Sequence, residues 1–153
     1  MPDIALLKPL ARALDTTVDT LLSYEKDLSD AEIASIKLEL NKTYQNHSYS
    51  EGEAKSKEYL REYPNSVPLK IVVASLVELY GIKWPEVAVK VMNKSADDVT
   101  KGKIQYVLSL YQDIVNSGNI KHRAPALHAL ARIYLIIGEL DKSENILNEI
   151  PSD

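Results

Sequence analysis

The stretch at residues 124–151, APALHALARIYLIIGELDKSENILNEIP, has the pattern of two helices joined by a short turn. Its first half spaces apolar side chains three and four residues apart, as on one helix face: Leu127, Leu130, Ala131 and Tyr134. Gly138 is expected to end this helix, because glycine readily takes the left-handed conformation that follows a helix C-terminus. Pro151 should stop the returning helix. That helix is expected to bury Ile146, Leu147 and Ile150.

The order of these residues resembles a tetratricopeptide repeat, with Ser143 at a position where that motif usually has alanine. A hairpin of this kind cannot bury its apolar faces alone, so the resemblance implies neighbours of the same kind. We therefore predict an all-α protein of six to nine helices. Residues 29–153 should form a tetratricopeptide-like array of antiparallel helices, an α–α superhelix.

Five more helices are predicted between residues 29 and 118, with Ser29 or Asp30 capping the first and Asp97 or Asp98 beginning the last. They span about residues 30–47, 50–63, 68–80, 85–92 and 98–116. Three of them have these expected inward residues: Ile33, Ile36, Leu40 and Tyr44 in the first; Ala54, Tyr59 and Leu60 in the second; Ile104, Val107, Leu108, Tyr111 and Val115 in the last. The helix at residues 68–80 is apolar almost all round, which indicates burial on every side.

Residues 1–23, MPDIALLKPLARALDTTVDTLLS, have the pattern of two short helices, with a kink or a restart expected at Pro9. One interpretation is a simple two-helix lead-in to the domain. The run also resembles the last two helices of the DNA-binding domain in lambda-repressor-like helix-turn-helix regulators, including the internal proline. In that family the recognition helix precedes this segment. The resemblance therefore implies that residues 1–25 are the remnant of a truncated helix-turn-helix domain, and that this chain contains no DNA-binding residue.

The C-terminal half resembles the repeat domain that follows the DNA-binding domain in many bacterial regulators of this class. The two resemblances predict the regulatory and dimerisation domain of a helix-turn-helix transcription regulator, which contacts DNA only through the missing N-terminal part. A homodimer is expected, because two DNA half-sites need two recognition helices at a fixed separation. The alternative is a free-standing helical-repeat adaptor that binds protein or peptide partners.

Composition limits the class of protein. The chain has 153 residues, 45% of them hydrophobic, which is sufficient for a real core and argues against disorder. Its net charge of −4 disfavours nucleic-acid binding by bulk electrostatics. It has no cysteine, no run resembling a signal peptide and no apolar stretch of membrane-spanning length. A cytoplasmic protein without a membrane partner is the simplest expectation.

No catalytic motif, phosphate-binding glycine loop or metal-binding histidine pattern occurs in the sequence, so we predict neither enzyme activity, nor a cofactor, nor a metal site. His122 and His128 are six residues apart and therefore fall on different faces of a helix. Acidic pairs such as Asp97 and Asp98 lie at predicted helix starts, where capping explains them. Structural or surface roles are the better interpretation for all of these residues.

One surface is a candidate for binding. If Tyr134 occupies its tetratricopeptide position, then His128, Arg132 and Leu135 face the concave side of the array, and Glu78 faces the same side from an earlier helix. Concave faces of such arrays commonly bind extended peptides, and an arginine can hold a carboxylate through two hydrogen bonds. The alternative, which the residues alone favour, is that Arg132 is a solvated charge on an amphipathic helix.

Overall fold

A computed structural model describes residues 28–150, and this part of the chain is entirely helical, with no strand. Its seven helices are α3 (Asp30–Asn46), α4 (Tyr49–Glu62), α5 (Val67–Gly81), α6 (Trp84–Met92), α7 (Asp98–Asn116), α8 (Ile120–Ile136) and α9 (Leu140–Glu149). The predicted all-α class is confirmed over this range. The two short helices predicted within residues 1–25, and the stop at Pro151, lie outside the described residues.

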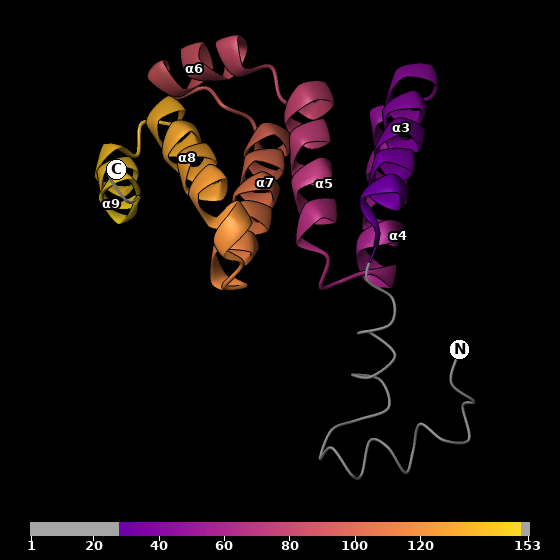
Figure 1. Cartoon of the computed structure of the whole chain (residues 1–153). Helices are drawn as coiled ribbons and strands as arrows, with labels where there is room; N and C mark the ends of the chain where they lie inside the picture. The colour runs from indigo at the N-terminus through magenta and orange to yellow at the C-terminus, as the bar shows by residue number, and fades with distance from the viewer. Residues whose placement is uncertain (1–27, 151–153) are drawn as a thin grey trace, which may run out of the picture.

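The helices form a row in which each packs on its neighbours (Figure 1). The α3–α4 hairpin lies at one end and packs on α5, which in turn packs on α7; α8 follows α7, and α9 closes the other end. The short helix α6 lies across the top of the row in this view and contacts α8. No helix between residues 28 and 150 has both the length and the apolar character needed to cross a bilayer.

Local capping explains where most of the helices begin. Five of the seven have an N-cap side chain that accepts a hydrogen bond from the backbone of the first turn: Ser29, Ser48, Ser66, Asp97 and Asn119. At α3 the side chain of Glu32 also bonds back to the Ser29 backbone, which completes a capping box. Of the residues predicted to begin α3 and α7, Ser29 rather than Asp30 caps α3, and Asp97 rather than Asp98 caps α7.

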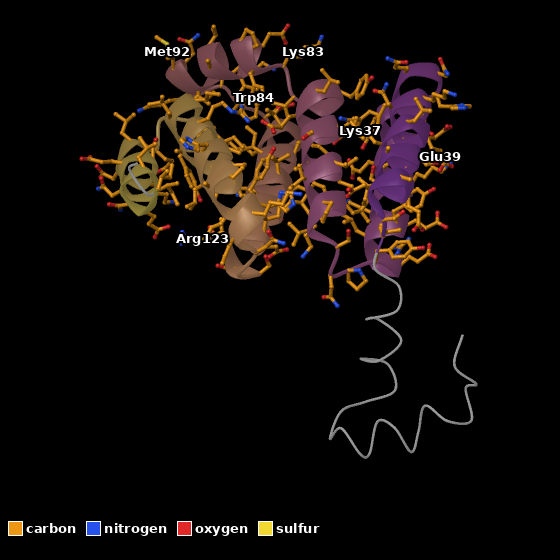
Figure 2. The ribbon with its side chains drawn as sticks, viewed as in Figure 1. Lys37, Glu39, Lys83, Trp84, Met92 and Arg123 are labelled. Carbon is orange, nitrogen blue, oxygen red and sulfur yellow. The ribbon has the colours of Figure 1, made fainter. Side chains whose placement is uncertain are left out.

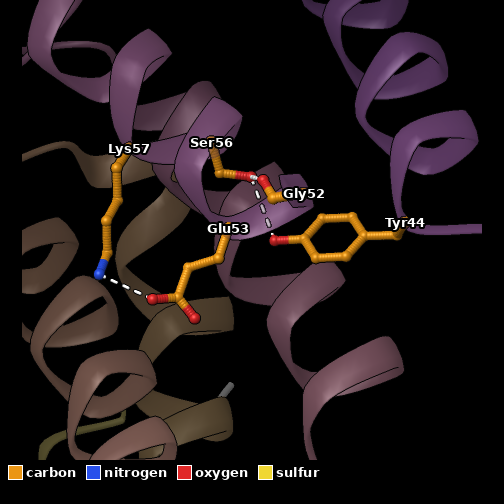
Figure 3. Close-up of polar contacts among 5 residues, drawn as sticks. All are labelled: Tyr44, Gly52, Glu53, Ser56 and Lys57. Carbon is orange, nitrogen blue, oxygen red and sulfur yellow. Dashed lines mark hydrogen bonds and ion pairs between the residues drawn. The ribbon is translucent and has the colours of Figure 1, made fainter. Parts of the chain in front are cut away.

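Tyrosine rings and glycines join α3, α4 and α5. The ring of Tyr44 stacks on that of Tyr80, with centroids 5.1 Å apart and planes 3° from parallel. Gly52 of α4 lies directly against Tyr44, since a Cβ on this glycine would come within 2.4 Å of the Tyr44 Cδ1 atom. The Tyr44 hydroxyl shares a hydrogen bond of 3.2 Å with Ser56 Oγ, which donates to the Gly52 carbonyl at 2.8 Å (Figure 3). Small residues on α4 thus make room for the aromatic ring.

This packing corrects two predicted faces. On α4 the buried residues are Gly52 and Ser56, whereas Ala54 is exposed, because the Tyr44 ring fills the space beside the smallest side chains. On α9 the prediction that Leu147 is buried is wrong, since its side chain is 50% exposed. Ser143 is the buried residue of α9, and its Oγ donates to the Ala131 carbonyl of α8 at 2.9 Å.

The other predicted faces agree with the structure in most positions. Ile36, Leu40 and Tyr44 are buried in α3, and seven residues from Val67 to Val77 are buried in α5. In α7 the buried set includes Leu110 and Ile114 in place of Leu108 and Val115, which are only partly buried. The helix α8 begins at Ile120, four residues before the predicted start, because Asn119 caps it there and Pro125 is accommodated inside it.

Candidate functional site

The structure brings together two of the four residues predicted for the concave face. Arg132 of α8 donates from Nη2 to Oε1 of Glu78 of α5, at 2.5 Å, across 54 positions of sequence. His128 and Leu135 lie on α8 with exposed side chains, and neither lines the pocket that surrounds the pair. Glu78 and Arg132 are therefore the part of the predicted face that forms a defined site.

The carboxylate of Glu78 links three helices. Its second oxygen, Oε2, accepts a hydrogen bond of 2.6 Å from the hydroxyl of Tyr111, which comes from α7. Burial raises the pKa of the Tyr111 hydroxyl well above its usual range, and the hydrogen bond to Glu78 raises it further. The Glu78 side chain is only 11% exposed, whereas that of Arg132 is 46% exposed. The carboxylate is thus held in place, while its arginine partner reaches solvent.

An open pocket of about 700 Å³ surrounds this pair between the end of α5, the start of α6 and α8. That volume lies within the range of ligand-binding sites. Leu79 presents a 68% exposed apolar side chain at the pocket. The other lining residues are Ser75, Ile82, Lys83, Trp84, Pro85 and Glu86. The pocket therefore combines an apolar surface with a small number of fixed charges.

Trp84 is a feature of this pocket that sequence reasoning missed. The sequence pattern predicts only a short helix over residues 85–92, with no role for Trp84, although this is the single tryptophan in the chain. Its ring lies 5.8 Å from the Arg132 guanidinium carbon, and Figure 2 shows it beneath α6. The Trp84 Nε1 atom is buried, and among residues 28–150 it has no hydrogen-bond partner. The available signal in the sequence was the single tryptophan itself, next to Pro85 at the junction of two predicted helices.

The sequence left two interpretations of Arg132 open, a peptide-binding residue and a solvated charge. Its contacts in the structure agree with parts of both. One guanidinium nitrogen is paired with Glu78, and no other hydrogen bond from this group to the described residues occurs. Arginine has five N–H donors in a rigid, planar fork. The remaining donors of Arg132 can therefore bind a carboxylate or a carbonyl oxygen while the pair with Glu78 keeps the side chain in place.

Among residues 28–150, no group of three His, Cys, Asp or Glu side chains is arranged to hold a metal ion. His47 pairs with Glu51 at 3.4 Å on the surface, at the junction of α3 and α4. The absence of enzyme activity and of a cofactor stays a prediction.

Comparison with known proteins adds no relative. No protein-family model, no curated protein and no solved structure matches this chain. The helix-turn-helix and tetratricopeptide resemblances therefore rest on the residues quoted for them.

Proposed function

We propose that residues 28–150 are the regulatory module of a bacterial helix-turn-helix transcription regulator, and that the module binds an extended peptide or protein segment. The observation that carries the proposal is the pocket between α5, α6 and α8, where Glu78 holds the half-exposed Arg132 beside Trp84 and Leu79. Tryptophan and arginine are enriched in protein-binding hot spots. The exposed Leu79 supplies the apolar contact that such sites need.

The pre-organised arginine favours a ligand that carries a carboxylate. The pair with Glu78 restricts the side-chain rotamers of Arg132 before any ligand arrives, which lowers the entropy cost of binding. Its unpaired N–H donors match the two oxygens of a carboxylate. An acidic side chain or a peptide C-terminus, with an apolar neighbour for Leu79, would fit this chemistry.

We further infer a tetratricopeptide-like arrangement in which α3, α5 and α8 are the first helices of successive hairpins. Side-chain hydrogen bonds join these three helices, from Tyr80 of α5 to Asn41 of α3 and from Arg132 of α8 to Glu78 of α5. The helices α4, α7 and α9 would then be the returning helices, with α6 inserted before α7. Each first helix would contribute to one concave surface, as repeat arrays do.

The hypothesis of a transcription regulator depends on residues 1–25, whose pattern resembles the end of a helix-turn-helix domain. In such a protein this module would also dimerise, so that two recognition helices meet two half-sites. A free-standing adaptor is the second candidate, because the pocket between α5, α6 and α8 would serve it equally well and requires no contact with DNA. The intact mass of the protein in its native host separates the two: a mass several helices above 17.1 kDa supports the regulator, and a mass of 17.1 kDa supports the adaptor.

Peptide binding is tested with Trp84 as the reporter. Peptides with free C-termini are selected from a displayed library on the wild-type chain and then titrated in solution, while the emission of this single tryptophan is followed. We expect the emission to change on binding, and the affinity to fall about tenfold or more in Arg132→Gln, because a charge-assisted pair is lost. Lys121→Gln, which alters an exposed cation on the same helix, is the control. Equal affinities in both variants, with unchanged Trp84 emission, would contradict the proposal.

A further inference from the structure

A second pocket lies on the opposite side of α8, between the loop after α6, the first half of α7 and the α8–α9 turn. Arg132 borders the first pocket and Tyr134 borders the second. Two helical positions correspond to a rotation of about 200°, so these residues face in different directions. The second pocket has a volume of about 580 Å³, which suits a small molecule.

Three lysines line this second pocket: Lys94, Lys101 and Lys142. Within residues 28–150 none of the three forms an ion pair. The lining contains one carboxylate, that of Glu139, so three positive charges and one negative charge give a formal net charge of +2. The whole chain carries −4. A local excess of positive charge in a concave site raises the local concentration of anions.

The inner surface of the pocket is apolar and partly aromatic. Ile104 is buried at its base, and Leu108 and Tyr134 are partly buried around it. The ammonium of Lys142 lies 5.7 Å from the centroid of the Tyr134 ring. A cationic rim over an apolar base is complementary to a molecule that has an anionic group on an apolar or aromatic body.

Two residues in the left-handed conformation shape the walls. Lys94 has φ of 54°, and it is the one non-glycine residue with positive φ in the described part of the chain. A lysine is more strained in this conformation than glycine or asparagine, yet it is here that the chain places one of the pocket cations. Gly138, with φ of 82°, turns the chain so that Glu139 and Lys142 return towards Val91 of α6.

We propose that this pocket binds a small organic anion with an apolar or aromatic body, at a site separate from the Arg132 pocket. The excess positive charge of the lining attracts the anionic group, while the body of the ligand covers Ile104, Leu108 and Tyr134. The inference goes beyond the proposed peptide binding and does not depend on it, because the two pockets share no lining residue.

The test uses two fluorescent probes of nearly the same shape. 1-Anilinonaphthalene-8-sulfonate carries an anionic group, and N-phenyl-1-naphthylamine is its neutral analogue. Both are titrated into the full chain, the double variant Lys101→Ala/Lys142→Ala, and the control Lys37→Ala/Lys121→Ala, which removes two exposed lysines elsewhere. All four lysines are at the surface, so we expect every variant to fold, and circular dichroism checks this.

We expect the anionic probe to bind the pocket variant at least about tenfold more weakly than the wild type, since two of three cations are gone. The affinity of the anionic probe for the control variant should differ from its affinity for the wild type by less than about twofold. The affinity of the neutral probe should differ by less than about twofold among the three proteins. A third variant, Lys83→Ala/Arg132→Ala, reports on the other pocket. An equal loss in the control variant, no loss in the pocket variant, or a loss confined to the Lys83/Arg132 variant would overturn the proposal.

Discussion

Glu78 of α5 accepts a hydrogen bond of 2.5 Å from Arg132 of α8, and this contact spans the pocket that we propose as the peptide-binding site. The Glu78 side chain is 11% exposed and the Arg132 side chain is 46% exposed. The contribution of this ion pair to the free energy of unfolding should therefore lie between that of a surface pair and that of a buried pair. We expect Arg132→Ala to lower the free energy of unfolding by about 1–2 kcal/mol, because Glu78 loses its charged partner. Urea denaturation followed by circular dichroism measures this.

A double-mutant cycle separates the interaction energy between Glu78 and Arg132 from the other effects of substituting each residue. The coupling energy between Arg132→Ala and Glu78→Ala should be about 0.5–1.5 kcal/mol. The exposed pair of His47 and Glu51, whose side chains are each 62% exposed, is the matched control and should give less than about 0.5 kcal/mol. Similar coupling energies for the two pairs would show that Glu78 and Arg132 act only as surface charges.

Two glycines inside helices should respond to alanine in opposite directions. A Cβ at Gly52 would lie 2.4 Å from the Tyr44 ring, so Gly52→Ala should lower the free energy of unfolding by about 1–3 kcal/mol through overpacking. A Cβ at Gly102 of α7 meets nothing within 4 Å, so Gly102→Ala should raise it by about 0.5–1 kcal/mol, because alanine favours the helix. Thermal unfolding of the two glycine variants tests these two predictions. Stabilisation by Gly52→Ala would mean that Tyr44 moves aside freely.

The register of α8 is tested by two leucines on different faces. Leu130 is fully buried, and Leu130→Ala should cost about 2–5 kcal/mol through the lost apolar contacts and the cavity left behind. Leu135 is 59% exposed, and Leu135→Ala should change the stability by less than about 0.5 kcal/mol. Denaturant unfolding of the two variants under the same conditions gives the comparison. A loss of less than about 0.5 kcal/mol for Leu130→Ala would refute the assigned register.

Stability should fall at alkaline pH because tyrosines are protected from ionisation in the folded state. Burial raises the pKa of Tyr106 to about 12, and the charges of Tyr44 and Glu53 contribute. An unfolded tyrosine ionises near pH 10, so between about pH 10 and pH 12 the unfolded state binds fewer protons than the folded state and gains in relative stability. The contribution of Tyr106 is thus complete below about pH 10 and is lost as pH rises towards about 12.

The measurement is urea unfolding at pH 8, 10 and 11.5, with tyrosinate absorbance followed in parallel. For Tyr106→Phe we expect a loss of stability over this range smaller than in the wild type by about 1–3 kcal/mol. Tyr59 has a pKa also raised to about 12, chiefly by its hydrogen bond to Glu39, so part of the alkaline sensitivity should remain. An unchanged pH dependence in Tyr106→Phe would show that this hydroxyl ionises normally in the folded protein.

Helix positions could be predicted from the sequence because the signals that set them are local. A serine or aspartate before a helix satisfies backbone donors in the next turn whatever the rest of the protein does, as Ser29 and Asp97 show. Gly138 marks the end of α8 for the same reason, since only the conformation of the residue itself is involved. The apolar run in α5 correctly predicted a largely buried helix, but the expected burial on every side is wrong, since Leu79 is 68% exposed.

Burial of small residues could not be predicted in the same way. Gly52 and Ser56 of α4 and Ser143 of α9 are buried because of what the neighbouring helix presents, a Tyr44 ring in the first case and the α8 backbone in the second. No apolar periodicity marks such positions, so the pattern pointed to Ala54 and Leu147 instead.

The candidate site, too, could be predicted from the sequence only in part. The order of residues in α8 predicts that Arg132 lies on one face of that helix, and the tetratricopeptide resemblance predicts only that Glu78 faces the same side from an earlier helix. The pocket itself, with Trp84 and Leu79 beside the pair, exists only because α6 lies across α8 next to the end of α5. Periodicity reports which side of one helix is apolar, whereas the meeting of side chains from three helices depends on how those helices pack, which is decided by tertiary contacts.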